Sequence, residues 1–225
     1  MGGTDKPKVS LQEPAQHHGV LDVFKKAGEV VFDGIAAIPG VVELAGMRYP
    51  VKTYSYKCSE QVTRGSRLDD AHIAELGKQG FKAIIDLTAE GTGDTDAALK
   101  AGMLAVNVPM MDNSLEFLTN PKKIEGQMVD MLCTVGAKEY QPVYMHCEAG
   151  VGRTGVAVAC YRMSIPSTPP GGGAPRVWTP DEAVAEAEKF GLHLPDQLNF
   201  IRTFGNDLAA GKFAAEGFPM TETSR

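Results

Sequence analysis

Residues 143–163 read VYMHCEAGVGRTGVAVACYRM, and this stretch indicates both the fold class and the place where chemistry occurs. An apolar run breaks into His146-Cys147, then into a glycine-rich turn with Arg153, and then returns to an apolar run. A buried strand followed by a glycine turn and a helix is typical of α/β proteins. The turn between the strand and the helix contains a cysteine, an arginine and glycines, which give the backbone unusual conformational freedom.

Strands and helices alternate on both sides of this corner. Apolar runs at 81–87, 103–109 and 142–147 predict strands, and the first and last have the composition of strands buried on both faces. A short strand is expected at 61–66, and 110–121 is expected to be a loop. Helices are predicted at 70–78, 95–101, 121–135, 154–163, 180–190 and 195–209, with a flexible connection at 164–176. The predicted fold class is α/β, with a central, mostly parallel sheet flanked by helices.

The length of 225 residues suits one large domain with extensions. Residues 1–18 are expected to be a mobile tail. Residues 19–59 are an N-terminal extension, in which 19–37 form an amphipathic helix that packs against the domain or lies on a membrane. The main domain is expected at 60–210, and residues 211–225 form a C-terminal tail.

Composition excludes several classes of function. The formal net charge of −6 argues against nucleic-acid binding. No apolar stretch is long enough to predict an integral membrane span, and the start lacks a signal peptide's apolar stretch, so a cytoplasmic location is expected unless a targeting segment has been removed.

The four cysteines lack the spacing of a disulfide framework or a zinc site, and Cys133 and Cys160 are predicted to be core residues of helices. No metal or cofactor is expected, because the His17-His18 pair lacks a third ligand at helical spacing.

The corner at Cys147 has the features of an anion cradle. Gly150 and Gly152 allow successive N–H groups to point inward, and the helix that follows adds the positive end of its dipole. The planar fork of Arg153 matches two phosphate oxygens. A thiol beside a helix N-terminus and an arginine ionises more readily than a free cysteine. The sequence therefore predicts that Cys147 is a nucleophile beneath a bound phosphate ester.

The string HCEAGVGRTG, residues 146–155, resembles the signature loop of the protein tyrosine phosphatase superfamily, the cysteine-dependent phosphatases. Residues 64–87, RGSRLDDAHIAELGKQGFKAIIDL, are similar to the entry of dual-specificity phosphatase domains. The resemblance covers about 60–210 and implies a catalytic domain there. Glu148 and the string IIDLTAEG are similar to the bacterial phosphatase-like inositol phosphatases, or cysteine phytases. Two departures from that subfamily are Gly155, where threonine is frequent, and DLT in place of DLR.

The resemblance implies roles for the residues of the loop. The phosphate would be held by Glu148, Ala149, Gly150, Val151, Gly152 and Arg153, and Cys147 would form a cysteinyl-phosphate intermediate. His146 is expected to orient the loop. The hydroxyl of Thr154 is expected to donate to the cysteine sulfur, and an N-terminal helix cap is an alternative role for it.

Two further catalytic groups are expected outside the loop. Asp112 lies 35 residues before Cys147, just after a predicted strand, and is the candidate general acid. A positioned acid is worth about 10²–10⁴-fold in rate. Glu116 is its nearest competitor, and an Asp-Asn turn is the structural alternative for Asp112. Gln197 resembles the glutamine that positions water in tyrosine phosphatases, although a solvated glutamine at a helix start would look the same.

The sequence thus predicts a phosphomonoester hydrolase that acts on phosphotyrosine- or phosphoserine-type proteins or on inositol polyphosphates. Inositol polyphosphates would need basic residues near the loop, and phosphotyrosine would need a deep aromatic-lined entrance, whereas aromatic residues make up only 7% of the chain. A non-catalytic phosphate-binding module and a cysteine sulfurtransferase are the alternatives. The candidate basic residues are Arg64, Arg67, Lys100, Lys122 and Lys123.

Overall fold

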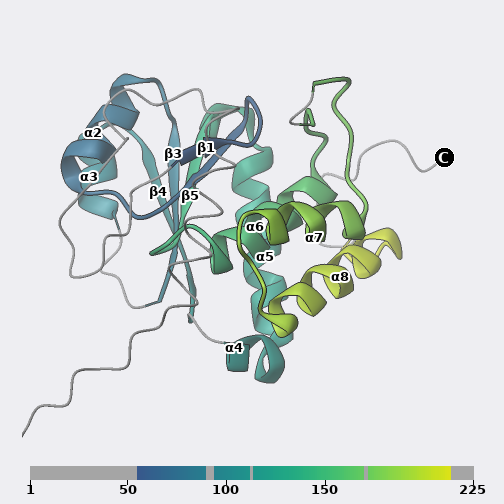
Figure 1. Ribbon diagram of the computed structural model, residues 1–225. Coiled ribbons are helices and arrows are strands. Elements are labelled where there is room, and N and C mark those ends of the chain that lie inside the picture. Colours follow the sequence, from purple (N-terminus) through teal and green to yellow (C-terminus); the bar gives the residue numbers. More distant parts are fainter. Residues whose placement is uncertain (1–54, 90–93, 112–113, 170–171, 214–225) are drawn as a thin grey trace, which may run out of the picture.

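The computed structural model describes residues 55–89, 94–111, 114–169 and 172–213 (Figure 1). The predicted tail at 1–18, the amphipathic helix at 19–37, most of the C-terminal tail and Asp112 lie outside these residues. No helix among the described residues is both long and apolar enough to cross a membrane.

A five-stranded sheet forms the centre of the domain, in the order β1-β2-β5-β3-β4. Among the strands of the described residues, only β1 runs antiparallel to its neighbour and the other pairs are parallel, which confirms the predicted mostly parallel sheet. The strands are β1 (Ser55–Lys57), β2 (Val62–Gly65), β3 (Ala83–Thr88), β4 (Leu104–Met110) and β5 (Val143–His146).

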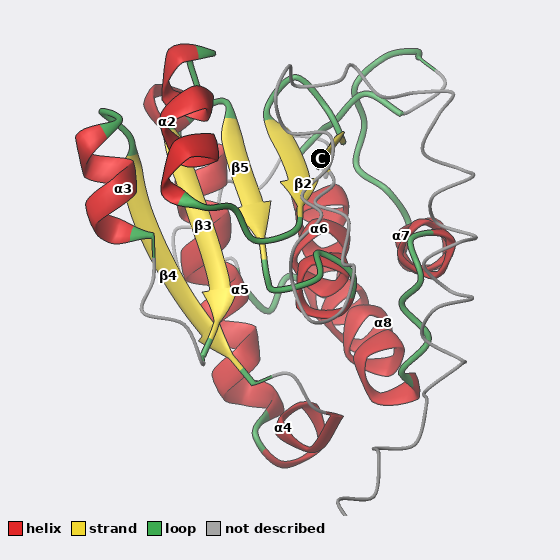
Figure 2. Ribbon diagram, turned by 60° about the vertical axis from the view of Figure 1, so that its left-hand side comes forward, coloured by secondary structure: helices red, strands yellow, loops and turns green. Residues whose placement is uncertain are grey.

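Helices cover both faces of the sheet, as Figures 1 and 2 show. One face carries α2 (Asp70–Lys78) and α3 (Thr95–Lys100). The opposite face carries α5 (Pro121–Gly136), α6 (Gly152–Ser164), α7 (Pro180–Lys189) and α8 (Pro195–Ala209), with α4 (Ser114–Thr119) at one end and a 3₁₀ turn at Lys138–Tyr140.

This two-sided cover explains why β3 and β5 are buried along their whole length. Ile84 and Tyr144 belong to the small core under α2 and α3, whereas Ile85 and Met145 belong to the large core on the other face. Successive strand residues point to opposite faces, so a strand between two cores is buried at every position, including polar Asp86 and His146. The prediction that these two strands are buried on both faces is confirmed.

The predicted loop at 110–121 is wrong in part, because α4 forms within it. Phe117 is buried and packs edge-to-face on Phe200 of α8, with ring centroids 5.5 Å apart. A helix of six residues has too few turns to show a helical period in sequence. Its formation depends on this tertiary contact.

The prediction that Cys133 is a core residue is also wrong, because its side chain is exposed. The buried stripe of α5 includes Val129 and Leu132, and residue 133 lies one position beyond it, on the solvent side. Cys160 is fully buried in α6, as predicted.

A buried ion pair joins α6 to α7. Arg162 is fully buried and donates to both carboxylate oxygens of Glu186, at 3.0 and 2.8 Å, and to the carbonyl oxygen of Cys58 at 2.9 Å. Burial alone would lower the pKa of Arg162, but the hydrogen bonds and charge of Glu186 outweigh it and raise that pKa. The guanidinium therefore remains charged inside the protein and depends on Glu186.

Replacing Glu186 with Ala is expected to lower the free energy of unfolding by about 3–5 kcal/mol, because an unpaired charge is left buried. Urea unfolding followed by circular dichroism measures the loss. Glu188→Ala is the matched control, because Glu188 is exposed on the same helix and should cost less than about 0.5 kcal/mol. Similar losses in both variants would contradict the assigned role of the pair.

Candidate active site

Cys147 lies at the carboxyl end of the central strand β5. The strand ends at His146 and α6 begins at Gly152, so the loop between them connects the middle of the sheet to a helix N-terminus (Figure 2). The cysteine is 2% exposed. The amide of Gly150 donates to its Sγ atom at 3.3 Å. The sulfur is therefore buried beside the loop amide of Gly150.

Carbonyl groups of the loop are held on its outer side. His146 Nδ1 lies 3.1 Å from the carbonyl oxygen of Cys147, and the amide of Arg67 donates to the carbonyl oxygen of Glu148 at 3.0 Å. In a planar trans peptide the C=O and the following N–H point in opposite directions. Holding these carbonyls outward thus turns the next amides, those of Glu148 and Ala149, to the inner side.

Arg64 holds the next part of the loop in the same way. Its Nη2 atom donates to the carbonyl oxygen of Gly150 at 2.8 Å, and its guanidinium lies 4.3 Å from the ring centroid of Phe190. Gly150 has a φ of +72°, and a Cβ there would lie 2.3 Å from the carbonyl oxygen of Gly65. Only glycine allows this approach. Arg64 is fully buried, so it is excluded as one of the basic residues that could contact a substrate.

Arg153 lies in the first turn of α6 and is fully buried. Its Nη1 atom donates to the carbonyl oxygen of Met110 at 3.1 Å. Met110 is the last residue of β4, and the connection that carries Asp112 follows it. Arg153 therefore links the loop to the segment on which the general acid is expected.

His146 has a second partner that the sequence analysis did not find. Its Nε2 atom lies 2.6 Å from Oδ2 of Asp94, a residue 52 positions away that is also buried. The only local signal was an aspartate before a predicted helix, which indicates a helix cap. Asp94 is the N-cap residue of α3, but its side chain makes no capping hydrogen bond.

Residues 43–170 match the family model of the DSP-PTPase phosphatase fused to NAD+ kinase. The chain belongs to this family. The resemblance to cysteine-dependent phosphatases is thereby confirmed, and the signature loop described above lies inside the matched region.

Relatives and solved structures agree with the family. The phosphatidylglycerophosphatase and protein-tyrosine phosphatase 1 of Rattus norvegicus is 32% identical over 73 residues, which are 31% of this chain and 33% of the rat protein. The match thus spans about a third of that relative's length.

Two solved structures share the fold at lower identity. The core catalytic domain of the PP-IP phosphatase SIW14 from S. cerevisiae is 20% identical, with a TM-score of 0.55, over 74% of this chain and 95% of that chain. P. aeruginosa TpbA in complex with pTyr is 19% identical, with a TM-score of 0.50, over 73% of this chain and 100% of that chain. Both support the tyrosine-phosphatase-like α/β fold.

The structure excludes one of the two roles considered for each of Thr154 and Gln197. Val151 is the N-cap residue of α6, so the alternative role of Thr154 as the cap is wrong. Gln197 is fully buried in the first turn of α8, so a solvated glutamine is also wrong. Neither the Thr154 hydroxyl nor the Gln197 amide has a hydrogen-bond partner among the described residues. Donation to sulfur and positioning of water remain predictions for these buried groups.

Glu116, the competitor of Asp112, is held in its ionised form. Burial favours the protonated acid, but hydrogen bonds from Lys123 Nζ at 2.8 Å and from the Met111 amide at 2.6 Å outweigh it and lower the pKa of the Glu116 carboxyl. A carboxylate with a lowered pKa is a poor proton donor near neutral pH. Asp112 therefore remains the candidate acid.

The basic residues proposed for substrate binding do not converge on the loop. Arg67 pairs with Glu148 at 3.5 Å, and Lys123 pairs with Glu116. Lys100 and Lys122 are exposed on α3 and α5, on opposite faces of the sheet. Among the described residues, positive charge at the site thus comes mainly from groups buried around the loop.

Iodoacetamide at about pH 6.5 is expected to label Cys147 first, with protection by inorganic phosphate. Burial raises the pKa of the Cys58 thiol to about 12, and burial also raises the pKa of Cys160, so both stay protonated and unreactive. Exposed Cys133 should react more slowly. Peptide mass spectrometry over time measures each site, and equally rapid labelling of Cys58 or Cys160 would contradict the assignment.

Proposed function

We propose that this chain is a phosphomonoester hydrolase that works through a cysteinyl-phosphate intermediate on Cys147. The observation that carries the proposal is the loop itself, which encloses the cysteine sulfur and turns its carbonyls outward. A non-catalytic phosphate-binding module would gain nothing from a cysteine at the centre of the cradle. A sulfurtransferase is disfavoured by the family to which the chain belongs.

In the first step the Cys147 thiolate attacks phosphorus. The amides of residues 148–152 and the fork of Arg153 bind the three equatorial oxygens, whose charge grows in the transition state. The bond from phosphorus to the ester oxygen breaks, and Asp112 gives its proton to that oxygen. The alcohol or phenol departs and leaves a thiophosphate on Cys147.

In the second step water replaces the cysteine. Asp112, now a carboxylate, takes a proton from the water while its oxygen attacks phosphorus, and Gln197 orients that water. The phosphorus–sulfur bond breaks, inorganic phosphate leaves, and Cys147 returns as a thiolate. Positioning and the field of the loop supply most of the rate, and the reaction needs no redox partner.

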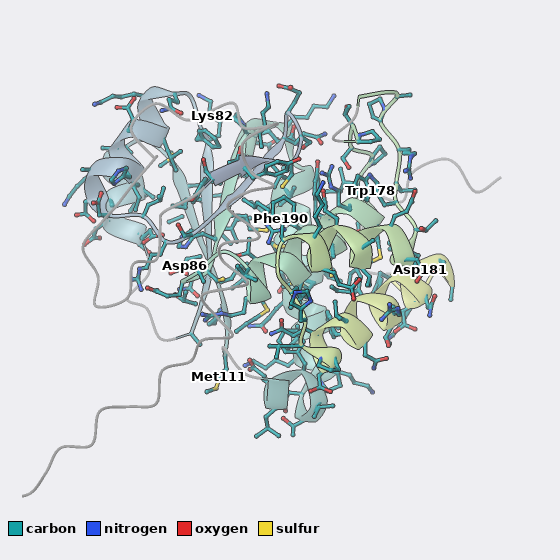
Figure 3. All side chains as sticks on the ribbon, in the orientation of Figure 1. Lys82, Asp86, Met111, Trp178, Asp181 and Phe190 are labelled. Atoms are coloured by element: carbon teal, nitrogen blue, oxygen red, sulfur yellow. The ribbon has the colours of Figure 1, made fainter. Side chains whose placement is uncertain are left out.

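The charge distribution favours a substrate with a single phosphate. Arg64 is buried, and Arg67 and Lys123 are paired with carboxylates, so the part of the chain that the structure describes forms no dense ring of exposed cations for an inositol polyphosphate. Met111, Leu115 and Leu118 expose their apolar side chains around the segment that carries Asp112, and Figure 3 shows Met111 pointing away from the body. This rim suits a phosphotyrosine in a protein.

A second candidate substrate follows from the family description. The family description names a fusion of the phosphatase to an NAD+ kinase, so a phosphate monoester of NAD+ is the second candidate. Such a monoester is chemically competent for the same two displacements. The cytoplasmic location and the absence of nucleic-acid partners expected from the sequence stay predictions.

Phosphate release from a panel of substrates tests the proposal. We expect a phosphotyrosine peptide to be hydrolysed faster than a phosphoserine peptide, NADP+ or an inositol polyphosphate. Cys147→Ser should reduce turnover by about 10⁴-fold or more and still bind inorganic phosphate, because the amides and Arg153 remain. A Cys147→Ser enzyme with more than about a tenth of the wild-type rate would overturn the proposed intermediate.

Asp112→Asn should slow an alkyl phosphate far more than an activated aryl phosphate such as nitrophenyl phosphate. Nitrophenolate departs almost unaided, whereas an alkoxide needs the proton of a positioned acid. The alkaline limb of the kcat/KM profile should flatten in the variant. Glu116→Gln is the matched control and should retain that limb, because Glu116 is already ionised. Equal losses on both substrates with an unchanged profile would assign the acid to another residue.

A further inference from the structure

A row of polar side chains crosses the sheet on the face that carries α3. Asp86 of β3 is in register with Asn107 of β4 on one side and with His146 of β5 on the other, and Figure 3 labels Asp86 on the sheet. Two positions earlier, the same strands contribute to the small core under α2 and α3 with Ile84, Ala105 and Tyr144. Side chains two positions apart on a strand share a face, so the polar row also faces these helices. The hydrolysis described above uses neither Asp86 nor Asn107.

Asp94 lies against this row from the start of α3. Its Oδ2 atom is 2.6 Å from Nε2 of His146, and its side chain makes no capping hydrogen bond. Asp86 and Asp94 are 2% and 8% exposed, and one ligand atom from each aspartate and from His146 lies within 4.8 Å of the other two. With both aspartates ionised, the cluster has a net negative charge whether His146 is neutral or charged.

One carboxylate oxygen of Asp86 has no partner. The Oδ1 atom accepts from the amide and the hydroxyl of Thr88, at 2.8 and 2.7 Å, which fixes the side chain. The Oδ2 atom is buried and has no hydrogen-bond partner among the described residues. No lysine or arginine in that part of the chain pairs with Asp86 or Asp94. Buried charges are normally paired or bound to a metal, so this oxygen is available to a cation.

A small cavity lies beside the two aspartates. Its volume is about 10 Å³, and its polar lining consists of Asp86, Asp94, Thr95 and Asn107. The aspartates are buried, whereas Thr95 and Asn107 are exposed, so the polar groups lead from solvent to the carboxylates. A space of this size holds about one water molecule or one ion.

The donors around the cavity are those of a hard divalent cation. Carboxylate, amide and hydroxyl oxygens suit Ca²⁺ and Mg²⁺, whereas zinc is bound mainly by nitrogen and sulfur. Ca²⁺ lies about 2.3–2.6 Å from its ligands, so two ligands on opposite sides of it are roughly 5 Å apart, and the 4.8 Å limit of the cluster falls within that span. Mg²⁺ would bring opposite ligands to within about 4.2 Å. The cluster therefore fits Ca²⁺ better than Mg²⁺.

We propose that Asp86, Asp94, Thr95 and Asn107 form a binding site for one Ca²⁺ ion behind the phosphate loop. Asp86 supplies its Oδ2 atom, and Asp94 supplies Oδ1, so the contact between Asp94 and His146 persists. The ion offsets the two carboxylates and joins β3 and β4 to the start of α3. Water completes its coordination at the exposed mouth. The proposal goes beyond the proposed function and does not rest on it.

The expectation that the chain holds no metal came from the spacing of histidines and cysteines. Oxygen ligands that come from two strands and the start of a helix leave no such pattern in the sequence.

Calorimetric titration of the full chain with CaCl₂, after treatment with EDTA, tests the site. We expect one Ca²⁺ per chain with a Kd of about 10⁻⁵–10⁻³ M, as in sites with few charged ligands, and weaker binding of Mg²⁺. Asp86→Asn should weaken Ca²⁺ binding about tenfold or more, because the amide keeps an acceptor for Thr88 but removes the charge. Asp96→Asn is the matched control and should bind as the wild type does, because Asp96 is exposed in the first turn of α3.

Thermal unfolding gives a pattern that a purely structural role of the aspartates would not produce. Ca²⁺ at about 100 times its Kd should raise the Tm of the wild type by about 5 °C and leave that of Asp86→Asn unchanged. Without Ca²⁺, Asp86→Asn should be at least as stable as the wild type, because it removes one of two like charges. Asn107→Asp should tighten Ca²⁺ binding about tenfold, because it adds a carboxylate at the exposed mouth of the cavity.

Three results would overturn the proposal. The first is a wild type that shows neither saturable Ca²⁺ binding nor a shift in Tm up to about 10 mM CaCl₂. The second is equal Ca²⁺ affinity in the wild type and Asp86→Asn, which places the ion elsewhere. The third is a preference for Zn²⁺ over Ca²⁺ that His146→Asn abolishes, which assigns the cluster to nitrogen ligation. All three are binding measurements, so they leave the proposed hydrolysis to be judged by its own tests.

Discussion

The Gly150 amide donates to the Cys147 sulfur, and the amides of Glu148 and Ala149 lie opposite to carbonyls that are held outward. Aligned N–H dipoles of this kind repel one another unless an anion lies between them. A peptide with free carbonyls would rotate to relieve that repulsion. The protein prevents this by giving the outward carbonyls strong partners, chiefly His146 for Cys147 and Arg64 for Gly150. A carbonyl with such a partner cannot turn inward without losing a hydrogen bond. Hydrogen bonds on the outer side of the loop thus hold it in the conformation that binds a phosphate.

The position of β5 in the sheet makes this bracing possible. The loop leaves the carboxyl end of a central strand, where β2 and β3 flank it on both sides. Arg64 comes from β2, Asp94 lies in the connection after β3, and Met110, the partner of Arg153, ends β4. Carboxyl ends of parallel strands meet at one edge, so these three distant segments reach the same loop. An edge strand would offer neighbours on one side only.

Sequence reasoning succeeded where the signal is local. The apolar runs predicted β3 and β5, and the glycine-rich string predicted the loop around Cys147, because backbone geometry and helix dipole act within a few residues. It failed where the deciding partner is far along the chain. No residue near Asp94 in the sequence indicates its hydrogen bond to His146. No residue near Arg64 indicates that its side chain is buried and donates to the carbonyl oxygen of Gly150, 86 residues further along the chain. The short helix α4 likewise has a distant partner, because Phe117 packs on Phe200 of α8.

Two buried arginines differ in their surroundings: one is paired with a carboxylate inside the fold, and the other lies beside the loop. Arg162 is paired with Glu186 through two hydrogen bonds, so its charge is compensated inside the fold. Arg64 is equally buried, and its guanidinium lies against loop carbonyls and the face of Phe190. Its Nε and Nη1 atoms have no hydrogen-bond partner among the described residues. An uncompensated buried cation destabilises the empty protein. The same charge favours a thiolate or a phosphate in the loop beside it, so the stability lost in building the site is recovered when an anion occupies it.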